Sequence, residues 1–106
     1  MSINDMYKKV IGAANKKMLF LPHTVKQMSR PDRMISKDEV RDVIFSGEII
    51  ENYPNDERGE SCLMMNILRT GRIIHVVCAP KDDYLAVLTA YIPSPVQWSA
   101  NFKERR

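Results

Sequence analysis

The sequence predicts an α+β protein in which about three helices pack on one face of a small antiparallel β-sheet. The first half of the chain carries apolar residues at helical spacing and one strong helix-start motif. The second half carries short β-branched runs separated by turn residues. Helices followed by a run of strands are typical of the α+β class. At 106 residues, we expect a single domain with a modest core.

Three helices are expected in the first half of the chain. The first runs from Ser2 to Lys17, because Ser-Ile-Asn-Asp fits a helix start and apolar residues then recur at helical spacing. The second runs from His23 to about Arg30, after Pro22 at the first turn. The third runs from Ile35 to Gly47. A short edge strand at Met18–Leu21 separates the first two helices.

The third helix has the clearest local signal. Ser36 can cap it, and Glu39 stands three residues later, where it can reach back and complete a capping box. Ile35 and Val40 are spaced as a hydrophobic staple. We expect Gly47 to end this helix in the left-handed conformation.

The second half predicts a strand, a polar loop and a β-meander. The four strands are Glu48–Tyr53, Ser61–Leu68, Ile73–Ala79 and Leu85–Ile92. Thr70-Gly71 suits a two-residue hairpin turn, which would pair Arg69 with Arg72 and place Asn66 opposite His75. After the meander, Trp98 and Phe102 are expected to fold back onto the body, with 103–106 as a frayed tail.

The next hairpin sets which face His75 occupies. If Ala79 pairs with Leu85, His75 lies opposite Thr89, and alternation puts Tyr91 on the same face. The opposite face is then wholly apolar and is expected to be the core. Its residues are Leu63, Met65, Ile67, Ile74, Val76, Cys78, Ala86, Leu88 and Ala90. We therefore expect the His75 face to be exposed and functional.

Charge and cysteine content narrow the class of protein. The net charge of +3 mildly favours a polyanionic partner such as RNA. No apolar run approaches a membrane span and no signal-peptide core precedes the first helix, so we expect a cytoplasmic protein. In the register above, Cys62 and Cys78 point to opposite faces, which argues against a disulfide. The spacing of Cys and His residues predicts no metal site, and nothing predicts a cofactor.

Several segments together resemble the DUF4258 family of small prokaryotic proteins. They are His23, Arg33-Met34-Ile35-Ser36, the run from Gly47 to Pro54 (Gly-Glu-Ile-Ile-Glu-Asn-Tyr-Pro), the run from Gly71 to Val77 (Gly-Arg-Ile-Ile-His-Val-Val) and Thr89-Ala90-Tyr91. The match covers about three quarters of the chain, in order and at nearly the right spacing. Gln27 replaces a usual arginine and Pro31-Asp32 resembles an insertion, so only His23 and Arg33 carry over from that helix. Residues 18–98 would be the family core, preceded by an extra helix at 1–17 and followed by a tail at 99–106.

The resemblance implies a fold related to the RelE and BrnT toxins. It also implies a toxin-like protein of a toxin–antitoxin system, held by an antitoxin-like protein that in some cases is a zinc-finger type. RNA is then a candidate substrate and metal-independent cleavage a candidate reaction. Whether the chain is an endoribonuclease stays open at this point.

The residues themselves suggest how such cleavage would work. His75 would be a general acid or base, with Tyr91 as a second proton donor or a stacking ring. Arg72 and Arg33 would bind phosphate, and His23 could join them. Asn66 or Thr89 would orient His75.

Three other interpretations stay open. His75, Asn66 and Thr89 could form a hydrogen-bonded cluster that is purely structural. The same sheet face, or a sheet edge, could bind a protein segment without any catalysis. A toxin directed at DNA gyrase would need no catalytic histidine.

Overall fold

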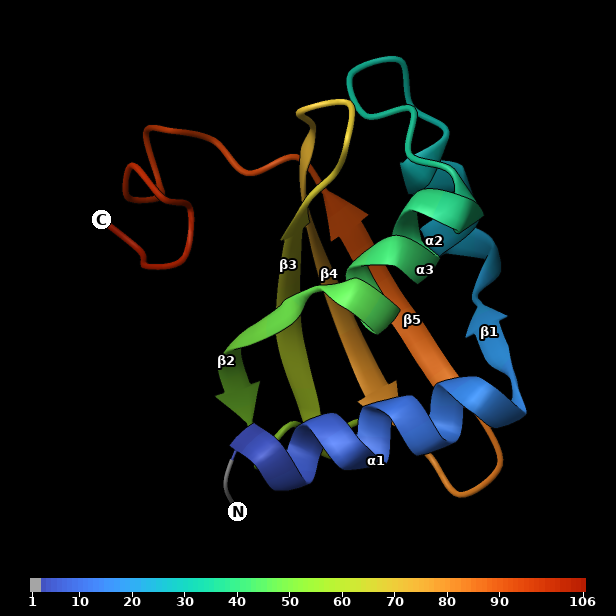
Figure 1. Ribbon diagram of the computed structural model, residues 1–106. Helices are drawn as coiled ribbons and strands as arrows, with labels where there is room; N and C mark the ends of the chain where they lie inside the picture. The colour runs from blue at the N-terminus through green and yellow to red at the C-terminus, as the bar shows by residue number, and fades with distance from the viewer. Residues whose placement is uncertain (1–2) are drawn as a thin grey trace.

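The protein is described by a computed structural model over residues 3–106, which contains three helices and five strands (Figure 1). In chain order these are α1 (Ile3–Lys16), β1 (Met18–Phe20), α2 (Pro22–Met28), α3 (Lys37–Ser46), β2 (Glu48–Tyr53), β3 (Ser61–Ile67), β4 (Ile73–Pro80) and β5 (Leu85–Tyr91). Every expected element is present, with bounds within two residues of the prediction. The helix-start signal at Ser2 lies outside the described residues.

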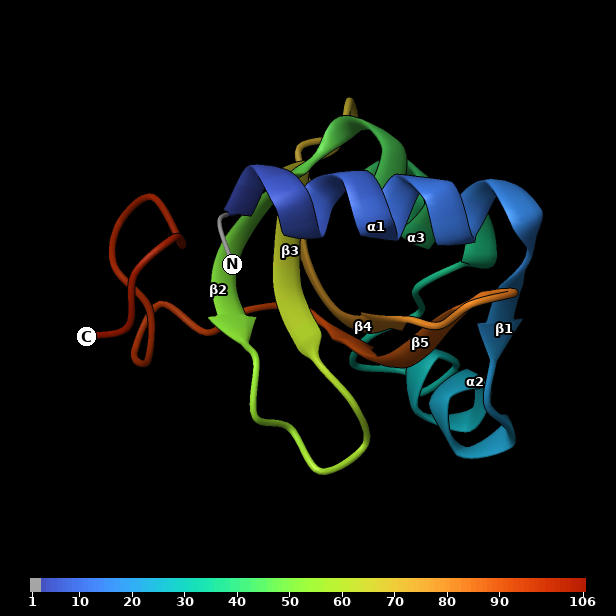
Figure 2. The same cartoon turned by 90° about the horizontal axis from the view of Figure 1, so that it is seen from below.

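The strands form one mixed sheet in the order β1-β5-β4-β3-β2. β1 runs parallel to β5, and the other neighbouring pairs are antiparallel, so the expected fully antiparallel sheet is wrong in its first strand. The expectation that all helices share one face is also wrong. Figure 2 shows α1 and α3 on one side of the sheet and α2 on the other, beside β1 and β5.

α2 lies there because β1 is short. β1 pairs only with residues 85–87 of β5 and leaves the edge of β5 open beyond them. The Thr24 hydroxyl on α2 donates to the Leu88 carbonyl (2.8 Å), and the Arg33 guanidinium in the following loop donates to the Ala90 carbonyl (2.9 Å). These side chains satisfy buried carbonyls that a longer strand would otherwise have paired.

The β3–β4 hairpin differs from the predicted register by one residue. Leu68 N–H donates to the Arg72 carbonyl, and Gly71 is left-handed (φ 89°), which gives a three-residue loop instead of a two-residue turn. His75 therefore lies opposite Met65 and not Asn66. A one-residue shift moves every β3 side chain to the other face, so Met64 packs in the core beneath the helices.

The same shift brings the two cysteines together. Cys62 and Cys78 are direct cross-strand partners on the core face, with 3.8 Å between their sulfur atoms, and both are free thiols. The prediction that they point to opposite faces is wrong. Cysteine here is a small buried apolar residue on each of two neighbouring strands.

Two β-bulges determine which side chains share a face with His75. In β5, Leu88 is unpaired between Thr89, opposite Val77, and Val87, opposite Cys78. The β4–β5 pairing also begins one residue away from the prediction, because Ala79 lies opposite Ala86 and not Leu85. The two shifts add to two residues, so Tyr91 and not Thr89 pairs with His75, and both side chains stay on the predicted face. The second bulge lies in β2.

The bulge in β2 occurs at Ile50, between the pairs Ile49–Met64 and Glu51–Leu63. Ile49 packs into the core, and simple alternation would turn Glu51 the same way. The extra residue instead turns Glu51 toward the His75 face, because a bulge re-aims the side chains that follow it.

α3 begins as predicted, and its end differs. The Ser36 hydroxyl accepts from Glu39 N–H (3.1 Å), and the Glu39 carboxylate accepts from Ser36 N–H (2.9 Å), so the capping box is formed. Gly47 is extended (φ −92°, ψ −165°) and not left-handed. Glycine is needed there for space, because a Cβ would overlap the carbonyl oxygens of Met65 and Val43.

Residues 93–106, called the C-terminal segment below, follow β5 and pass to the side of the sheet where β2 and β3 lie (Figure 1). Trp98 is 2% exposed, which confirms that this ring folds back onto the body. The predicted frayed tail is wrong. Arg105 binds Glu51 of β2, and Arg106 N–H donates to the Gln97 carbonyl (2.9 Å).

Candidate functional site

His75 lies on β4 and points to the sheet face away from α1 and α3. Tyr91 is its direct neighbour on β5, with 3.2 Å between the hydroxyl oxygen and His75 Nδ1. His75 Nε2 lies 2.8 Å from the carbonyl oxygen of Phe102 in the C-terminal segment. A carbonyl can only accept, so Nε2 carries the proton and Nδ1 accepts from the Tyr91 hydroxyl.

The C-terminal segment covers this histidine. The Trp98 ring stands edge-on to His75 with 4.5 Å between ring centroids, and the Tyr91 ring is 5.3 Å away. His75 has no exposed surface. The shared face of His75 and Tyr91 agrees with the sequence expectation, whereas the expected exposure of His75 is wrong. The burial of His75 was not predicted, because the register argument considered only the sheet and not residues 93–106.

A carboxylate and an arginine complete the cluster around His75. Glu51 accepts a bidentate pair of hydrogen bonds from Arg105, Nε to Oε2 at 2.9 Å and Nη2 to Oε1 at 3.1 Å. The Tyr53 hydroxyl also donates to Glu51 Oε1. The Arg105 guanidinium stacks over the Trp98 ring, 4.7 Å from its centroid.

The electrostatics of this cluster keep Glu51 ionised and His75 neutral. Burial opposes ionisation of Glu51, but hydrogen bonds from Arg105 and Tyr53 outweigh it and lower the pKa of the carboxyl group. Burial lowers the pKa of His75, although the Phe102 hydrogen bond and the negative charge of Glu51 act in the opposite direction. Burial also raises the pKa of Tyr91, so its hydroxyl stays protonated.

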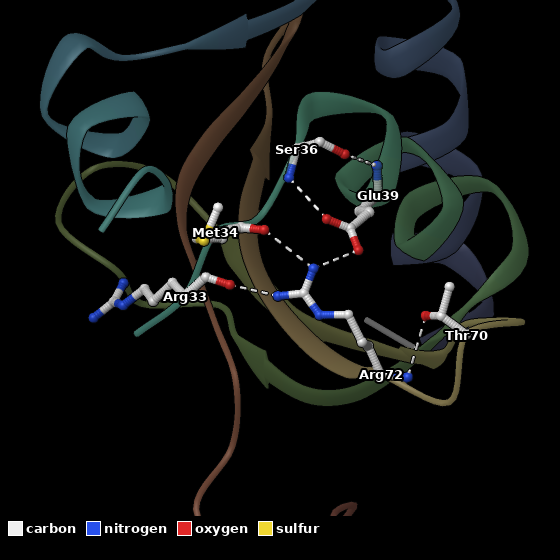
Figure 3. A network of polar contacts seen from close by, with 6 residues as sticks. All are labelled: Arg33, Met34, Ser36, Glu39, Thr70 and Arg72. Carbon is white, nitrogen blue, oxygen red and sulfur yellow. Dashed lines mark hydrogen bonds and ion pairs between the residues drawn. The ribbon is translucent and has the colours of Figure 1, made fainter. Parts of the chain in front are cut away.

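Arg72 lies on the other side of the sheet from His75. Its Nη1 donates to Glu39 Oε2 (2.6 Å) and to the Met34 carbonyl (3.1 Å), and its Nη2 donates to the Arg33 carbonyl. Figure 3 shows this guanidinium enclosed by the loop before α3 and by the capping box. The phosphate-binding role predicted for Arg72 is therefore corrected to a structural one, since its donors hold the α2–α3 loop.

One of the carbonyl groups that Arg72 contacts belongs to a residue with an unusual backbone conformation. Met34 is left-handed (φ 46°), which is disfavoured for a residue with a side chain. This conformation coexists with the donation of Arg72 to the Met34 carbonyl. Glu39 thus serves two functions, because one carboxylate oxygen closes the capping box and the other pairs with Arg72.

Neither residue predicted to orient His75 contacts it. Asn66 faces the helices and its side-chain amide donates to the Asp42 carbonyl of α3 (3.3 Å). Thr89 lies two positions from Tyr91 on β5 and its hydroxyl donates to Gln27 of α2 (3.3 Å). The shifted β3 register accounts for the error at Asn66, and the shifted start of the β4–β5 pairing together with the β5 bulge accounts for the error at Thr89. Tyr91 and the Phe102 carbonyl hold the imidazole instead.

The two residues carried over from the helical half lie at the β1–β5 side of the sheet. Arg33 is half-buried, and one of its nitrogens binds the Ala90 carbonyl, next to Tyr91 in the chain. Figure 3 shows that its side chain points away from the Arg72 network. His23 is exposed at the start of α2, and within residues 3–106 no hydrogen bond links it to His75.

Three residues of the cluster were not predicted, namely Glu51, Trp98 and Arg105. Glu51 stands inside the quoted Gly47–Pro54 run, and alternation alone assigns it to the wrong face because the bulge at Ile50 is not visible in the pattern. Trp98 was expected to fold back, but its partner could not be derived. Arg105 was assigned to a frayed tail, since Lys103-Glu104-Arg105-Arg106 carries no apolar residue to anchor it.

Two further features of the described chain concern metals and membranes. Residues 3–106 contain no cluster of three or more His, Cys, Asp or Glu side chains arranged to hold a metal ion. Within the same range, no helix combines the length and apolar character needed to cross a membrane.

The fold and the cluster define a small α+β domain with acid–base side chains on the sheet face opposite α1 and α3. A family model described as a domain of unknown function, DUF4258, matches residues 20–92. The protein belongs to this DUF4258 family. The matched region contains Glu51, His75 and Tyr91, whereas α1 and the C-terminal segment lie outside it. No curated protein and no solved structure matched the chain.

Proposed function

We propose that this DUF4258 protein is a toxin-like ribonuclease that cleaves RNA by general acid–base catalysis at Glu51, His75 and Tyr91. One observation supports this proposal above the others. A carboxylate, an imidazole and a phenol from β2, β4 and β5 share one sheet face, and His75 is hydrogen-bonded to Tyr91. The sequence resemblance to the RelE and BrnT toxin fold adds the substrate class.

The reaction needs one proton removed and one supplied. The Glu51 carboxylate takes the proton from a ribose 2′-hydroxyl, whose oxygen then forms a bond to the adjacent phosphorus. Once the C-terminal segment is away, solvent reaches His75 and the ring takes up a proton. This imidazolium then gives the Nε2 proton to the 5′-oxygen as the bond from that oxygen to phosphorus breaks. The products are a 2′,3′-cyclic phosphate and a free 5′-hydroxyl, so no other reactant is consumed.

Two supporting roles follow from the geometry. Tyr91 binds His75 Nδ1 and leaves Nε2 as the nitrogen that faces the substrate, once the C-terminal segment is away. Arg33 binds phosphate with the guanidinium nitrogens that the Ala90 carbonyl does not use. The net charge of +3 attracts RNA over longer distances.

An antitoxin-like protein is the proposed partner in the cell. A protein that cleaves cellular RNA needs a control on its activity, and the resemblance implies a small neighbouring protein in that role. A zinc-finger antitoxin would carry its own metal, so the metal would belong to the partner and not to this chain.

The test compares purified full-length protein with two conservative variants on total RNA, with and without ribosomes. His75→Gln keeps a donor and an acceptor but cannot supply an imidazolium proton, and Tyr91→Phe removes the hydroxyl alone. We expect cleavage by the wild type, loss of at least about a hundredfold in His75→Gln and a smaller loss in Tyr91→Phe. Circular dichroism checks that both variants are folded. Undiminished cleavage by His75→Gln would refute the proposed mechanism.

A non-enzymatic binding module is the second candidate, and an open strand edge favours it. The last β2–β3 pair is Glu48–Met65, so β3 continues beyond its neighbour. In an antiparallel ladder, the backbone groups of successive residues point alternately to the two neighbouring strands. Leu68 N–H donates to the carbonyl of Arg72, directly before β4, so the amide and carbonyl of Ile67 point to the other, open edge. Ile67 is 59% exposed there, beside a groove of about 530 Å³ between α3 and the hairpin. An extended peptide could add to this edge, and it would co-purify with a protein that leaves RNA intact.

A further inference from the structure

We propose that the C-terminal segment is a built-in inhibitor of the Glu51–His75–Tyr91 site. In the closed form described here it occupies the atoms that the reaction needs, and it opens locally while the sheet stays folded. This inference rests on the proposed function and adds its regulation.

The segment blocks both proton-transfer groups at once. The Phe102 carbonyl occupies His75 Nε2, the nitrogen that would protonate the leaving oxygen. Arg105 takes both carboxylate oxygens of Glu51, which would accept the proton of the 2′-hydroxyl. The Trp98 ring fills the space beside the imidazole. A substrate therefore cannot reach either group until these three residues move.

The segment is attached in a way that allows it to leave the sheet without breaking a ladder, and its own short turns lose the support of the packed Trp98 ring when it leaves. Its backbone hydrogen bonds stay within the segment, for example Ser99 N–H to the Glu104 carbonyl (2.7 Å) and Arg106 N–H to the Gln97 carbonyl (2.9 Å). It forms no ladder with a sheet strand in residues 3–106; its bridge joins Trp98 and Arg105, both inside it. Opening breaks side-chain contacts and one carbonyl hydrogen bond, and leaves the sheet ladders paired.

The C-terminal segment is held on the sheet by one buried ring, Trp98, and by weaker ion pairs at the surface. Trp98 is almost fully buried and provides most of the apolar contact. The ion pairs of Arg105 with Glu51 and of Lys103 with Glu48 involve largely exposed basic side chains. Phe102 is held left-handed (φ 61°) where it meets His75, a conformation that is released when the segment leaves.

The family comparison separates the segment from the domain that carries the site. The match ends at residue 92, directly before the segment, and it includes all three proposed catalytic residues. Pro93 and Pro95 follow at once and restrict the backbone where the segment leaves β5. The segment thus lies outside the matched region and turns back over the site inside that region.

The experiment measures opening by amide hydrogen exchange and activity by RNA cleavage on the same full-length proteins. Arg105→Ala removes the pair with Glu51, and an exposed ion pair shifts such an equilibrium by up to about fivefold. Arg106→Ala is the matched control, because Arg106 Nε donates to the Pro95 carbonyl inside the segment and, within residues 3–106, makes no ion pair with Glu51. We expect exchange of residues 97–106 to accelerate up to about fivefold in Arg105→Ala, with no change in β3 and β4. RNA cleavage should rise by the same factor.

The outcomes separate this inference from the proposed function. Exchange of residues 97–106 that is as slow as in β3 and β4 would show a fixed part of the core and would overturn local opening. Faster exchange with unchanged cleavage would overturn the inhibitory role. Faster exchange with no RNA cleavage by any variant would refute the proposed ribonuclease function. The C-terminal segment would then cover a site with a different function.

Discussion

His75 is the residue on which the proposed chemistry depends, and burial makes it sensitive to pH. Charged or titratable groups facing it come from three elements, namely Glu51 on β2, Tyr91 on β5 and Arg105 in the C-terminal segment, whereas β3 places the apolar Met65 opposite it. Burial lowers its pKa below the ordinary 6.5, and the Phe102 hydrogen bond and Glu51 only partly compensate. The folded protein therefore holds neutral His75 in preference to the imidazolium.

The sign of the pH effect follows from this shift. Between the folded pKa of His75 and 6.5, the unfolded chain binds the proton more readily than the folded one. The contribution of His75 to stability is complete above pH 6.5 and is lost as the pH falls toward the folded pKa. Urea denaturation should show a lower free energy of unfolding at about pH 5.5 than at about pH 7.5.

The control for that measurement is His75→Gln, which has no group titrating in this range. Its unfolding free energy should fall less over the same interval. Glu51 does not confuse the comparison, because its pKa is lowered from 4.5 and its contribution is lost only as the pH falls below that value. If the unfolding free energy fell equally with pH in the wild type and in His75→Gln, the pH effect could not be assigned to His75.

The paired cysteines make a prediction about reactivity. Cys62 and Cys78 are fully buried, and the hydrogen bond between the two thiols together with burial raises the pKa of the Cys78 thiol well above its ordinary range. A thiol reagent such as DTNB should modify neither cysteine in the native protein and both in denaturant. If DTNB detects no thiol in denaturant either, the pair is a disulfide and the structure is wrong at this point.

At the scale of elements, Gly47 makes the junction between α3 and β2 possible. A methyl group there would overlap the Met65 and Val43 carbonyl oxygens, so either β3 or the end of α3 must move. We expect Gly47→Ala to destabilise the protein by about 1–3 kcal/mol in urea denaturation.

The matched control is Gly12→Ala in the middle of α1. Nothing lies within 4 Å of a Cβ at Gly12, and alanine is the better helix former. This variant should stabilise the protein by about 0.5–1 kcal/mol. The same Gly→Ala change should therefore lower the free energy of unfolding at position 47 and raise it at position 12. Equal changes in the two variants would contradict the account of Gly47.

The elements could be predicted from the sequence, and the register could not. Helical spacing, the Ser36–Glu39 capping box and the β-branched runs are local signals, so the elements were predicted within two residues of their bounds. Register depends on the Arg69–Gly71 loop and on the bulges at Ile50 and Leu88, which need tertiary packing to form.

The same distinction explains what was missed at the site. His75 and Tyr91 were correctly placed on one face, because the one-residue register error at the β4–β5 hairpin and the one-residue bulge at Leu88 add to two residues, which keeps the alternation. Asn66 was misplaced by the β3 shift, and Arg72 was assigned to phosphate although it binds Glu39 on the helical side. Arg105 gave no local signal, since its partner Glu51 is 54 positions away in the chain.

At the scale of the whole molecule, the two faces of the sheet have different coverings. α1 and α3 cover one face with a continuous apolar core (Figure 2). α2 and the C-terminal segment cover the other, where a small second cluster of Ala79, Ala86 and Leu88 lies near Leu21. The second covering includes the C-terminal segment, which is held to the sheet by Trp98, by two ion pairs and by the Phe102 carbonyl, and which lies over the acid–base groups.

Under the proposed mechanism, activity would be a property of the whole chain. The region matched by the family model would contribute the proton-transfer groups, and the residues after it would determine whether a substrate can reach them. An antitoxin-like partner could act at the same place by holding the C-terminal segment closed.

The most direct test is the rate of RNA cleavage by Arg105→Ala compared with the double variant Arg105→Ala, His75→Gln. The account predicts that Arg105→Ala cleaves up to about fivefold faster than the wild type, and that the added His75→Gln change removes this activity. Equal cleavage by the two variants, or none by Arg105→Ala while hydrogen exchange shows the segment open, would contradict it.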